Sequence, residues 1–175
     1  LVDFFANHLK PFRDEFSFES HGEYVDYLKT NNLRSLNGDP VKSKGELIIA
    51  NFLYSNGIEY KYEARYPHPT IDGESTRAYQ PDFTIVTPEG HSVPDVYIEF
   101  WGVDRNGGTA KGIDEREYQK GMDWKRKVHR AKGTILVELY HYESQEGALE
   151  GRLVEELNKQ GVPFSPISVD DLFEK

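Results

Sequence analysis

The chain has 175 residues, no cysteine and a formal net charge of -9. Its length allows one domain with a proper core, or a domain with a helical appendage, and the absence of cysteine excludes disulfides and thiolate zinc sites. The acidic charge argues against a protein that coats DNA by neutralising phosphates. No run approaches the roughly 18 apolar residues of a membrane span, and the N-terminus lacks the zones of a signal peptide, so we expect a soluble, cytoplasmic chain with no membrane partner.

The first part of the chain, residues 1–40, predicts a helical lead-in or linker. Short helices are expected at 2–9 and 23–30, with Pro11 as an interruption between them. A turn is expected at 37–40, where Asn, Gly, Asp and Pro follow one another.

The next part predicts one helix followed by strands. Ser43 is a candidate N-cap of a helix that runs to about residue 56 and stops at Gly57. Strands are expected at 58–66, 79–87 and 96–103, because β-branched and aromatic residues alternate there. Gly90 and Pro94 between the last two strands favour a hairpin.

From residue 104 onward, loops, helices and strands alternate. We expect a Gly-rich loop at 104–112, a helix at 115–132, a buried strand at 134–142, a helix at 146–160, a short strand at 162–164, and a last helix capped by Ser168. The order helix, three strands, helix, strand, helix indicates an α/β fold in which helices sandwich a mixed sheet.

Two acids stand in strands where a solvated face is not expected. Asp82 follows Pro81 and precedes Phe83-Thr84-Ile85, and Glu99 lies within Val96-Tyr97-Ile98-Glu99-Phe100-Trp101. A buried carboxylate is unfavourable unless it is paired, hydrogen-bonded or bound to a cation. Two such acids on neighbouring strands predict a divalent-metal site and suggest a nuclease. The simpler alternatives are a turn acid for Asp82 and a core Tyr or Lys partner for Glu99.

The order of elements and these residues resemble the PD-(D/E)XK nuclease superfamily, which has the restriction-endonuclease-like fold. Within it, the phrase Val41-Lys42-Ser43-Lys44-Gly45-Glu46 through Gly57-Ile58-Glu59-Tyr60 is similar to the nuclease segment of UvrD-like and helicase IV-type DNA helicases. The Pro81-Asp82, Ile98-Glu99 and 118–133 segments continue the match, which covers 41–166 and leaves 167–175 as a C-terminal connection.

The resemblance implies a mixed β-sheet flanked by helices and a metal-dependent DNase. Asp82, Glu99 and the carbonyl of Phe100 would hold Mg²⁺ or Mn²⁺, which take oxygen ligands, and Glu46 would be a ligand or a water-orienting acid. It also implies DNA as partner, a role in DNA repair and a helicase motor in the same polypeptide. The sequence leaves open whether a single copy or a homodimer acts.

The pattern departs from the family at the lysine, because Trp101 stands where the usual motif has Lys. In several branches of the superfamily that lysine lies on the following helix. At about 100° per residue, Lys125 falls on the helix stripe that faces the sheet, whereas Lys120 and Lys127 fall on the opposite side. Lys125 is therefore the predicted catalytic lysine, and a snorkelling side chain is the alternative. The rest of the stripe is Tyr118, Met122 and His129.

A basic strip runs along the same helix. Residues 120–132 contain six Lys or Arg and one acid, Asp123. Such a strip on an acidic body would steer nucleic acid across a metal site, although a solvated helix face is the plain alternative. The predicted nucleic-acid contacts are Lys120, Arg126, Lys127 and Arg130.

Other readings of the same residues stay open. Ser43 and Glu46 have the spacing of a capping box, in which the glutamate bonds the backbone of the serine. The main rival to a nuclease is a catalytically inactive DNA-binding or scaffolding domain that kept the fold, for which Trp101 is the best support. A third class is a protein-interaction module whose contact surface is the helical lead-in.

Overall fold

The protein is a mixed α/β structure, which confirms the predicted class; the computed structural model describes residues 12–86 and 95–168. Four strands form the main sheet in the order β1 (Tyr60–Tyr62), β4 (Phe83–Ile85), β5 (Val96–Trp101) and β6 (Ile135–Tyr140). The β1–β4 and β4–β5 pairs are antiparallel, and β5 and β6 are parallel. The expected pairing of β4 with β5 is confirmed, while Gly90 and Pro94 lie outside the described residues.

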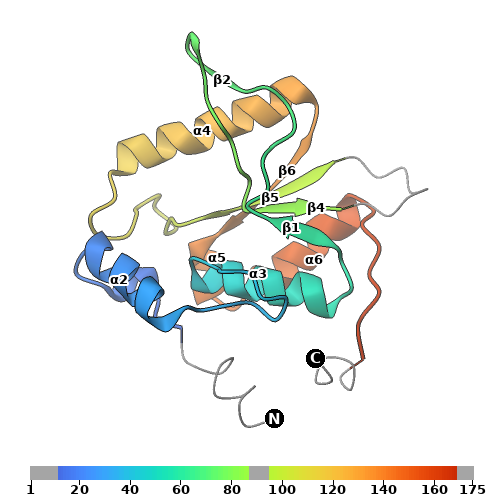
Figure 1. The fold of residues 1–175 in the computed structure, drawn as a ribbon, viewed down its shortest axis with the longest axis horizontal. Helices are drawn as coiled ribbons and strands as arrows, with labels where there is room; N and C mark the ends of the chain where they lie inside the picture. The colour runs from blue at the N-terminus through green and yellow to red at the C-terminus, as the bar shows by residue number, and fades with distance from the viewer. Residues whose placement is uncertain (1–11, 87–94, 169–175) are drawn as a thin grey trace.

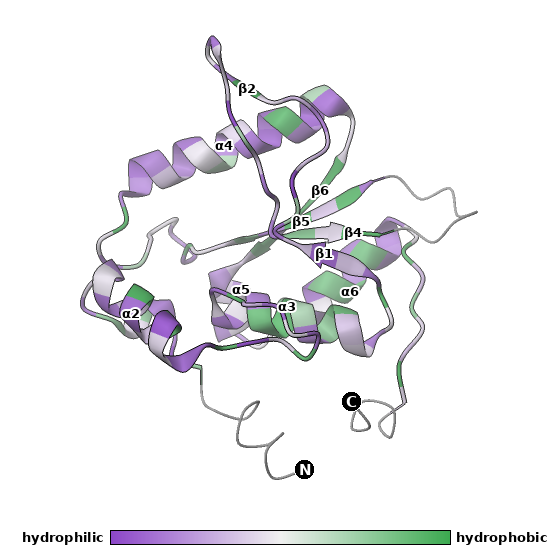
Figure 2. Cartoon of the chain, viewed as in Figure 1, coloured by the Kyte–Doolittle hydropathy of each residue, from purple (hydrophilic) through white to green (hydrophobic). Residues whose placement is uncertain are grey.

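Helices cover both faces of this sheet. The long helix α4 (Glu115–Lys132) lies on one face, and α3 (Lys44–Ser55), α5 (His141–Gln145) and α6 (Leu149–Lys159) lie on the other (Figure 1). In Figure 2, α3 is largely hydrophobic and α6 is hydrophobic in part, whereas α4 is mostly hydrophilic. Of the helices in the described ranges, none has the length and apolar character needed to span a bilayer.

The ends of α3 and α4 follow from local capping. The Oγ of Ser43 accepts the backbone N–H of Glu46 at 3.0 Å, and Gly57 follows the helix with φ of 62°. Asp114 caps α4 in the same way, and Gly133 ends it in the left-handed conformation. Both helices therefore lie where the sequence predicts them, because their start and stop signals are contained in adjacent residues.

The main core lies between the sheet and the layer formed by α3 and α6. Its fully buried members include Ile49, Leu53, Phe83, Ile98, Leu139 and Leu153. The lead-in helix α2 (His21–Asn31) and the short helix η1 (Glu15–Ser17) belong to a segment that adds Phe12, Phe18, Tyr24 and Leu33 to the same core. The predicted helix at 2–9, Pro11 and the helix after Ser168 lie outside the described residues.

The first predicted strands are much shorter in the structure. The expected strand at 58–66 keeps regular strand geometry only in β1, because Glu63, with φ of 46°, departs from the extended conformation. Similarly, the strand expected at 79–87 is reduced to β4. The chain between them forms a projection that ends in two strands, β2 (Ile71–Asp72) and β3 (Ser75–Thr76), which were not predicted.

Four further predictions need correction. The strand at 162–164 is wrong, because this segment runs along the end of α3, where the Ser165 N–H donates to Asn56 O at 2.8 Å. The strand at 134–142 stops at residue 140, where α5 begins. The helix at 146–160 starts only at residue 149, because Gly147 separates it from α5 with φ of 70°. The strand at 96–103 ends at Trp101.

A substitution at Gly45 tests how closely α3 approaches the sheet. A Cβ at Gly45 would lie 2.0 Å from Cζ of Phe100. We expect Gly45→Ala to lower the free energy of unfolding by about 1–3 kcal/mol, since overpacking outweighs the gain in helix propensity of up to about 1 kcal/mol. Urea unfolding measures the difference.

Gly151→Ala is the matched control. Gly151 also lies in the first turn of a helix, but a Cβ there would meet nothing within 4 Å. The control should raise the free energy of unfolding slightly, since only the helix-propensity gain remains. Equal effects of the two substitutions would contradict the close α3–β5 contact.

Candidate active site

Strand β5 presents alternate residues to the two helix layers. Ile98 and Phe100 belong to the core under α3 and α6, whereas Tyr97 and Trp101 belong to the clusters on the α4 side. Glu99 shares the α4 side and is 1% exposed. A carboxylate is thus buried in the middle of a strand, as the sequence predicted.

Glu99 is held by two side chains from different elements. Its Oε2 accepts from Nζ of Lys125 at 2.5 Å, and its Oε1 accepts from the hydroxyl of Tyr79 at 2.8 Å. Burial, and next the negative charge of Asp82, raise the pKa of Glu99 to about 8. The prediction that Lys125 faces the sheet is confirmed, and both Lys120 and Lys127 are exposed.

Asp82 lies just before β4 and reaches the neighbouring strand. Its Oδ2 accepts the backbone N–H of Phe100 at 2.7 Å. This bond places Asp82 beside the Glu99–Phe100 peptide, so two acids from neighbouring strands meet. Burial raises the pKa of Asp82, while the charge of Lys125 and the hydrogen bond from Phe100 oppose that increase.

Glu46 joins the same electrostatic cluster from α3. Its Oε2 accepts from the Lys42 N–H at 2.9 Å and from the Tyr62 hydroxyl at 2.6 Å. Burial, and next the charge of Asp82, raise the pKa of Glu46 to about 7. Half of the expected capping box is present, since Ser43 caps the helix. The carboxylate of Glu46, however, bonds the backbone of Lys42 rather than that of Ser43.

A pocket opens beside these residues. Its volume is about 390 Å³, and its walls include Glu46, Phe100, Tyr118, Glu15 and Tyr24. Glu15 comes from η1, and burial raises its pKa. The lead-in segment therefore supplies part of the wall next to Glu46, which its sequence did not indicate.

Few side chains near Glu99 are able to serve as ligands of a divalent metal ion. Within residues 12–86 and 95–168, no group of three or more His, Cys, Asp or Glu lies close enough to hold a metal ion. The candidate set consists of the Asp82 and Glu99 carboxylates and the carbonyl of Phe100. These oxygen donors fit Mg²⁺ or Mn²⁺. Lys125 pairs with Glu99, so the two acids together still carry one negative charge in excess of this lysine, which a bound cation would offset.

Trp101, two residues after Glu99 on the same strand, packs on the α4 side of the sheet. Its Nε1 donates to Oε2 of Glu138 at 2.9 Å, and Nζ of Lys125 lies 4.9 Å from a Trp101 ring centroid. The positive charge beside Glu99 is therefore supplied by Lys125 of α4, because Trp101 on the strand carries no charge. Glu138 is in turn paired with Arg126 at 2.7 Å.

A buried hydrogen-bond chain continues from Glu99 away from the pocket. The Tyr79 hydroxyl lies 2.8 Å from Nε2 of His129, whose Nδ1 lies 2.7 Å from Oγ1 of Thr134. The Thr134 hydroxyl lies 2.6 Å from that of Tyr66. These residues are up to 68 positions apart in the sequence, so their pairing is a product of the fold.

The direction of this chain follows from donor counting. Burial raises the pKa of Tyr79, so its single hydroxyl hydrogen is retained and points to Glu99. His129 must then donate from Nε2 to the Tyr79 oxygen and accept at Nδ1 from Thr134. Burial, and next the charge of Lys125, lower the pKa of His129 to about 4, consistent with this neutral tautomer. His129 and Tyr79 therefore position Glu99.

The predicted nucleic-acid contacts divide into two groups. Lys120 pairs with Glu117 at 2.6 Å, and Arg126 pairs with Glu138 and Asp123. Lys127 and Arg130 are exposed and form no ion pair within the described part of the chain. Only the second group presents an uncompensated charge.

Comparison with known proteins adds no identification. No protein-family profile, curated protein or solved structure matches this chain.

The pH dependence of stability tests the environment of Glu46. Because the pKa rises from 4.5 to about 7 on folding, the folded chain keeps a proton that the unfolded chain releases. Stability therefore falls as pH rises through this window. Gln at this position can accept the same bonds without titrating. As pH rises from about 4.5 to 7.5, the free energy of unfolding of Glu46→Gln should therefore increase by roughly 2–3 kcal/mol relative to that of the parent.

Urea unfolding of both proteins with a chelator at several pH values measures this change. Comparing the variant with the parent cancels other titrating groups, including His129, whose lowered pKa acts in the opposite direction. A pH-independent difference would show that Glu46 ionises normally in the folded protein.

Proposed function

We propose that this chain is a divalent-metal-dependent DNA nuclease with a restriction-endonuclease-like, PD-(D/E)XK arrangement. The observation that carries the proposal is the convergence of Asp82, Glu99 and Lys125, which come from the start of β4, from β5 and from α4. Groups whose pKa values are shifted by burial and by mutual charge are typical of functional sites, and Glu46 and Phe100 connect this cluster to a pocket. A four-stranded mixed sheet flanked by helices also supports the proposal.

In this proposal, Asp82, Glu99 and the Phe100 carbonyl hold Mg²⁺ or Mn²⁺. Such an ion, when bound, makes water more acidic and neutralises charge on a phosphodiester. Lys125 contributes a fixed positive charge beside Glu99, and its ammonium retains further N–H groups for a water or a phosphate oxygen. Tyr79 and His129 keep the Glu99 carboxylate oriented.

Glu46 has the geometry to hold a water molecule. Both of its hydrogen bonds engage Oε2, so Oε1 has no hydrogen-bond partner among the described residues. The residue lines the pocket of about 390 Å³ together with Phe100. With its pKa near 7, the carboxylate is able to accept a proton near neutral pH, as a water-orienting acid requires.

The second candidate function is a DNA-binding or scaffolding domain without catalysis. The observation that favours it is the 2.5 Å contact between Lys125 and Glu99, which neutralises the buried acid without a metal. Trp101 adds a bulky ring at the strand position where the motif has lysine. A helicase motor in the same polypeptide and a homodimer remain part of the wider proposal, based on the sequence resemblance.

Asp82→Asn should abolish metal-dependent cleavage and leave the fold intact. The amide is isosteric and its oxygen is able to accept the Phe100 N–H, so only the negative charge is lost. The measurement is cleavage of single-stranded and plasmid DNA at low salt with Mn²⁺, Mg²⁺ or EDTA. Full activity of this variant would contradict the assignment of the site to Asp82. An inactive parent that still binds DNA would favour the non-catalytic domain.

Lys125→Ala should reduce cleavage by at least about a hundredfold, the scale of one positioned catalytic group. Lys120→Ala is the matched control on the same helix, where the lysine is exposed and pairs only with Glu117. The control should stay within about threefold of the parent, because salt screens an exposed charge. Rates for both variants under identical metal conditions provide the comparison, and equal losses would mean that α4 acts through phosphate attraction alone.

A further inference from the structure

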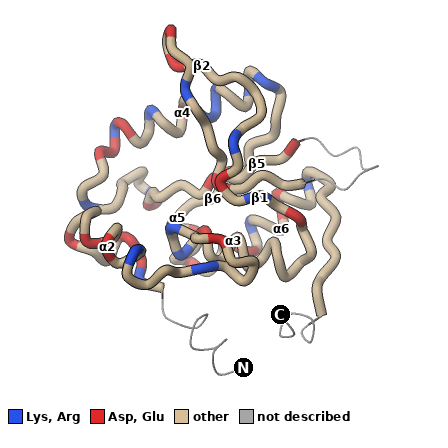
Figure 3. The backbone as a smooth tube through the Cα atoms, in the orientation of Figure 1, with Lys and Arg blue, Asp and Glu red and all other residues tan. Residues whose placement is uncertain are grey.

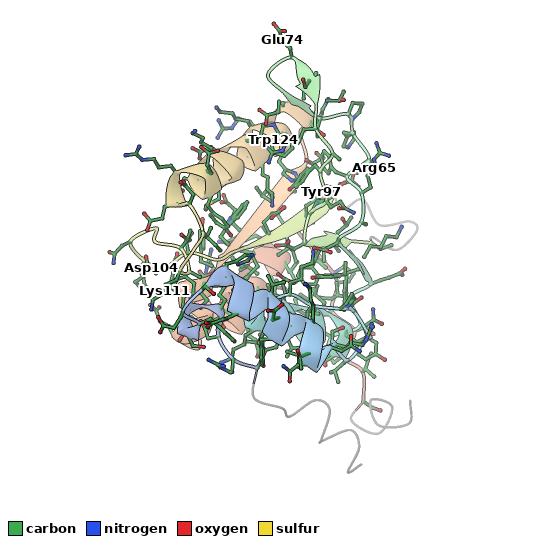
Figure 4. The ribbon with its side chains drawn as sticks, turned by 60° about the vertical axis from the view of Figure 1, so that its left-hand side comes forward. Arg65, Glu74, Tyr97, Asp104, Lys111 and Trp124 are labelled. Carbon is green, nitrogen blue, oxygen red and sulfur yellow. The ribbon has the colours of Figure 1, made fainter. Side chains whose placement is uncertain are left out.

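The connection between β1 and β4 forms a two-stranded arm, residues 63–82. Its legs are joined where Tyr66 N–H donates to Tyr79 O at 2.9 Å and Arg77 N–H donates to Thr70 O at 3.1 Å. The arm ends in the β2–β3 turn and projects from the sheet beside α4 (Figure 1). Figure 4 shows Glu74 at its tip, with Arg65 and Trp124 below.

Trp124 fixes the arm to α4. Its Nε1 donates to Ile71 O at 2.9 Å, and the guanidinium of Arg77 lies 4.1 Å from a Trp124 ring centroid. The ring also contacts Tyr79 edge-on at 5.6 Å. Since Tyr79 belongs to the arm and donates to Glu99, the arm contacts the candidate active site directly.

Two hollows flank the arm and are lined by positive charge. One, of about 420 Å³, lies between the arm and α4, and the other, of about 600 Å³, lies between the legs. Their charged lining residues are Arg65, Arg77, Lys127, Lys132 and Asp72. Four bases against one acid contrast with the whole chain, which has 21 bases and 30 acids. Figure 3 shows acidic residues gathered instead on α2 and at the arm tip.

Three of these bases are available to a ligand. Arg65, Lys127 and Lys132 are exposed and form no ion pair or hydrogen bond within the described residues. Arg77, in contrast, is shared between Asp72 and Trp124. The free charges lie on both sides of the arm, so a ligand that meets them all must cross it.

The same surface has an apolar part. Ile71 is 62% exposed on the arm and lines the hollow next to α4, together with Pro69 and Trp124. A cationic rim around apolar and aromatic side chains matches a single nucleic-acid strand, which offers phosphates and unstacked bases together. A duplex offers its phosphates but keeps its bases stacked inside.

We infer that the arm and the adjacent end of α4 bind a single-stranded segment of nucleic acid. Arg65, Lys127 and Lys132 contact its phosphates, and Ile71 contacts a base. The inference rests on the proposed function for the choice of nucleic acid as ligand, and it adds the strandedness of the substrate and its path beside the site.

Fluorescence anisotropy with a labelled single-stranded oligonucleotide in EDTA at low salt tests this surface without any cleavage. Lys127→Gln and Lys132→Gln should each weaken binding several-fold and together about tenfold or more, and each should lower the salt slope by about 0.7. Lys29→Gln is the matched control, an exposed lysine on α2. It should bind as the parent does. Ile71→Ser should weaken binding with no change in the salt slope.

Parent-like binding by the double variant would overturn the inference, as would a preference of about tenfold for duplex of the same length. Because EDTA prevents metal-dependent cleavage, the result is independent of catalysis. Loss of binding in the double variant, with no cleavage by the parent, would uphold the surface while the nuclease proposal fails. Active cleavage together with unchanged binding in the double variant would overturn the surface alone.

Discussion

The burial of Glu99 in β5 is the constraint on which the arrangement of the α4 side depends. A carboxylate that is 1% exposed requires compensation, and it receives a cation from α4 and a hydroxyl from the arm. Removing either partner would leave a buried charge or a buried acceptor without its bond. The long helix and the arm are thereby held to the same point of the sheet.

Burial raises the pKa values of three neighbouring acids, Glu46, Asp82 and Glu99. The charge of Asp82 raises the pKa of both Glu46 and Glu99; hydrogen bonds from Tyr62 and the Lys42 backbone oppose this rise at Glu46, and Lys125 and Tyr79 oppose it at Glu99. A purely structural site would favour apolar residues of similar volume, which are often more stable than a buried ion pair. This expected loss of stability is one reason for the proposal that the charges serve a chemical role.

The arm, residues 63–82, connects the buried Glu99 to the hollows on the surface beside α4. Tyr79 on one leg donates to Glu99, and Arg77 two residues earlier lies over Trp124. The orientation of Glu99 and the position of the arm on α4 therefore both depend on the contact between Tyr79 and Trp124. Trp124 is partly buried, and its ring is engaged by Arg77 and Tyr79.

The sequence by itself determined the parts whose signals are local. Ser43 and Gly57 delimit α3, Gly133 ends α4, and helix periodicity directs Lys125 to the sheet, because capping and periodicity involve residues only a few positions apart. The tertiary structure decided what depends on distant residues. Tyr79 and His129 are 50 positions apart, and Glu46 bonds Tyr62 across 16. The tertiary structure also decided the length of β1, which pairs with β4 over three residues. It likewise placed residues 162–164 along α3 rather than in a sheet. Such partners become neighbours only when the chain closes, so no local pattern encodes them.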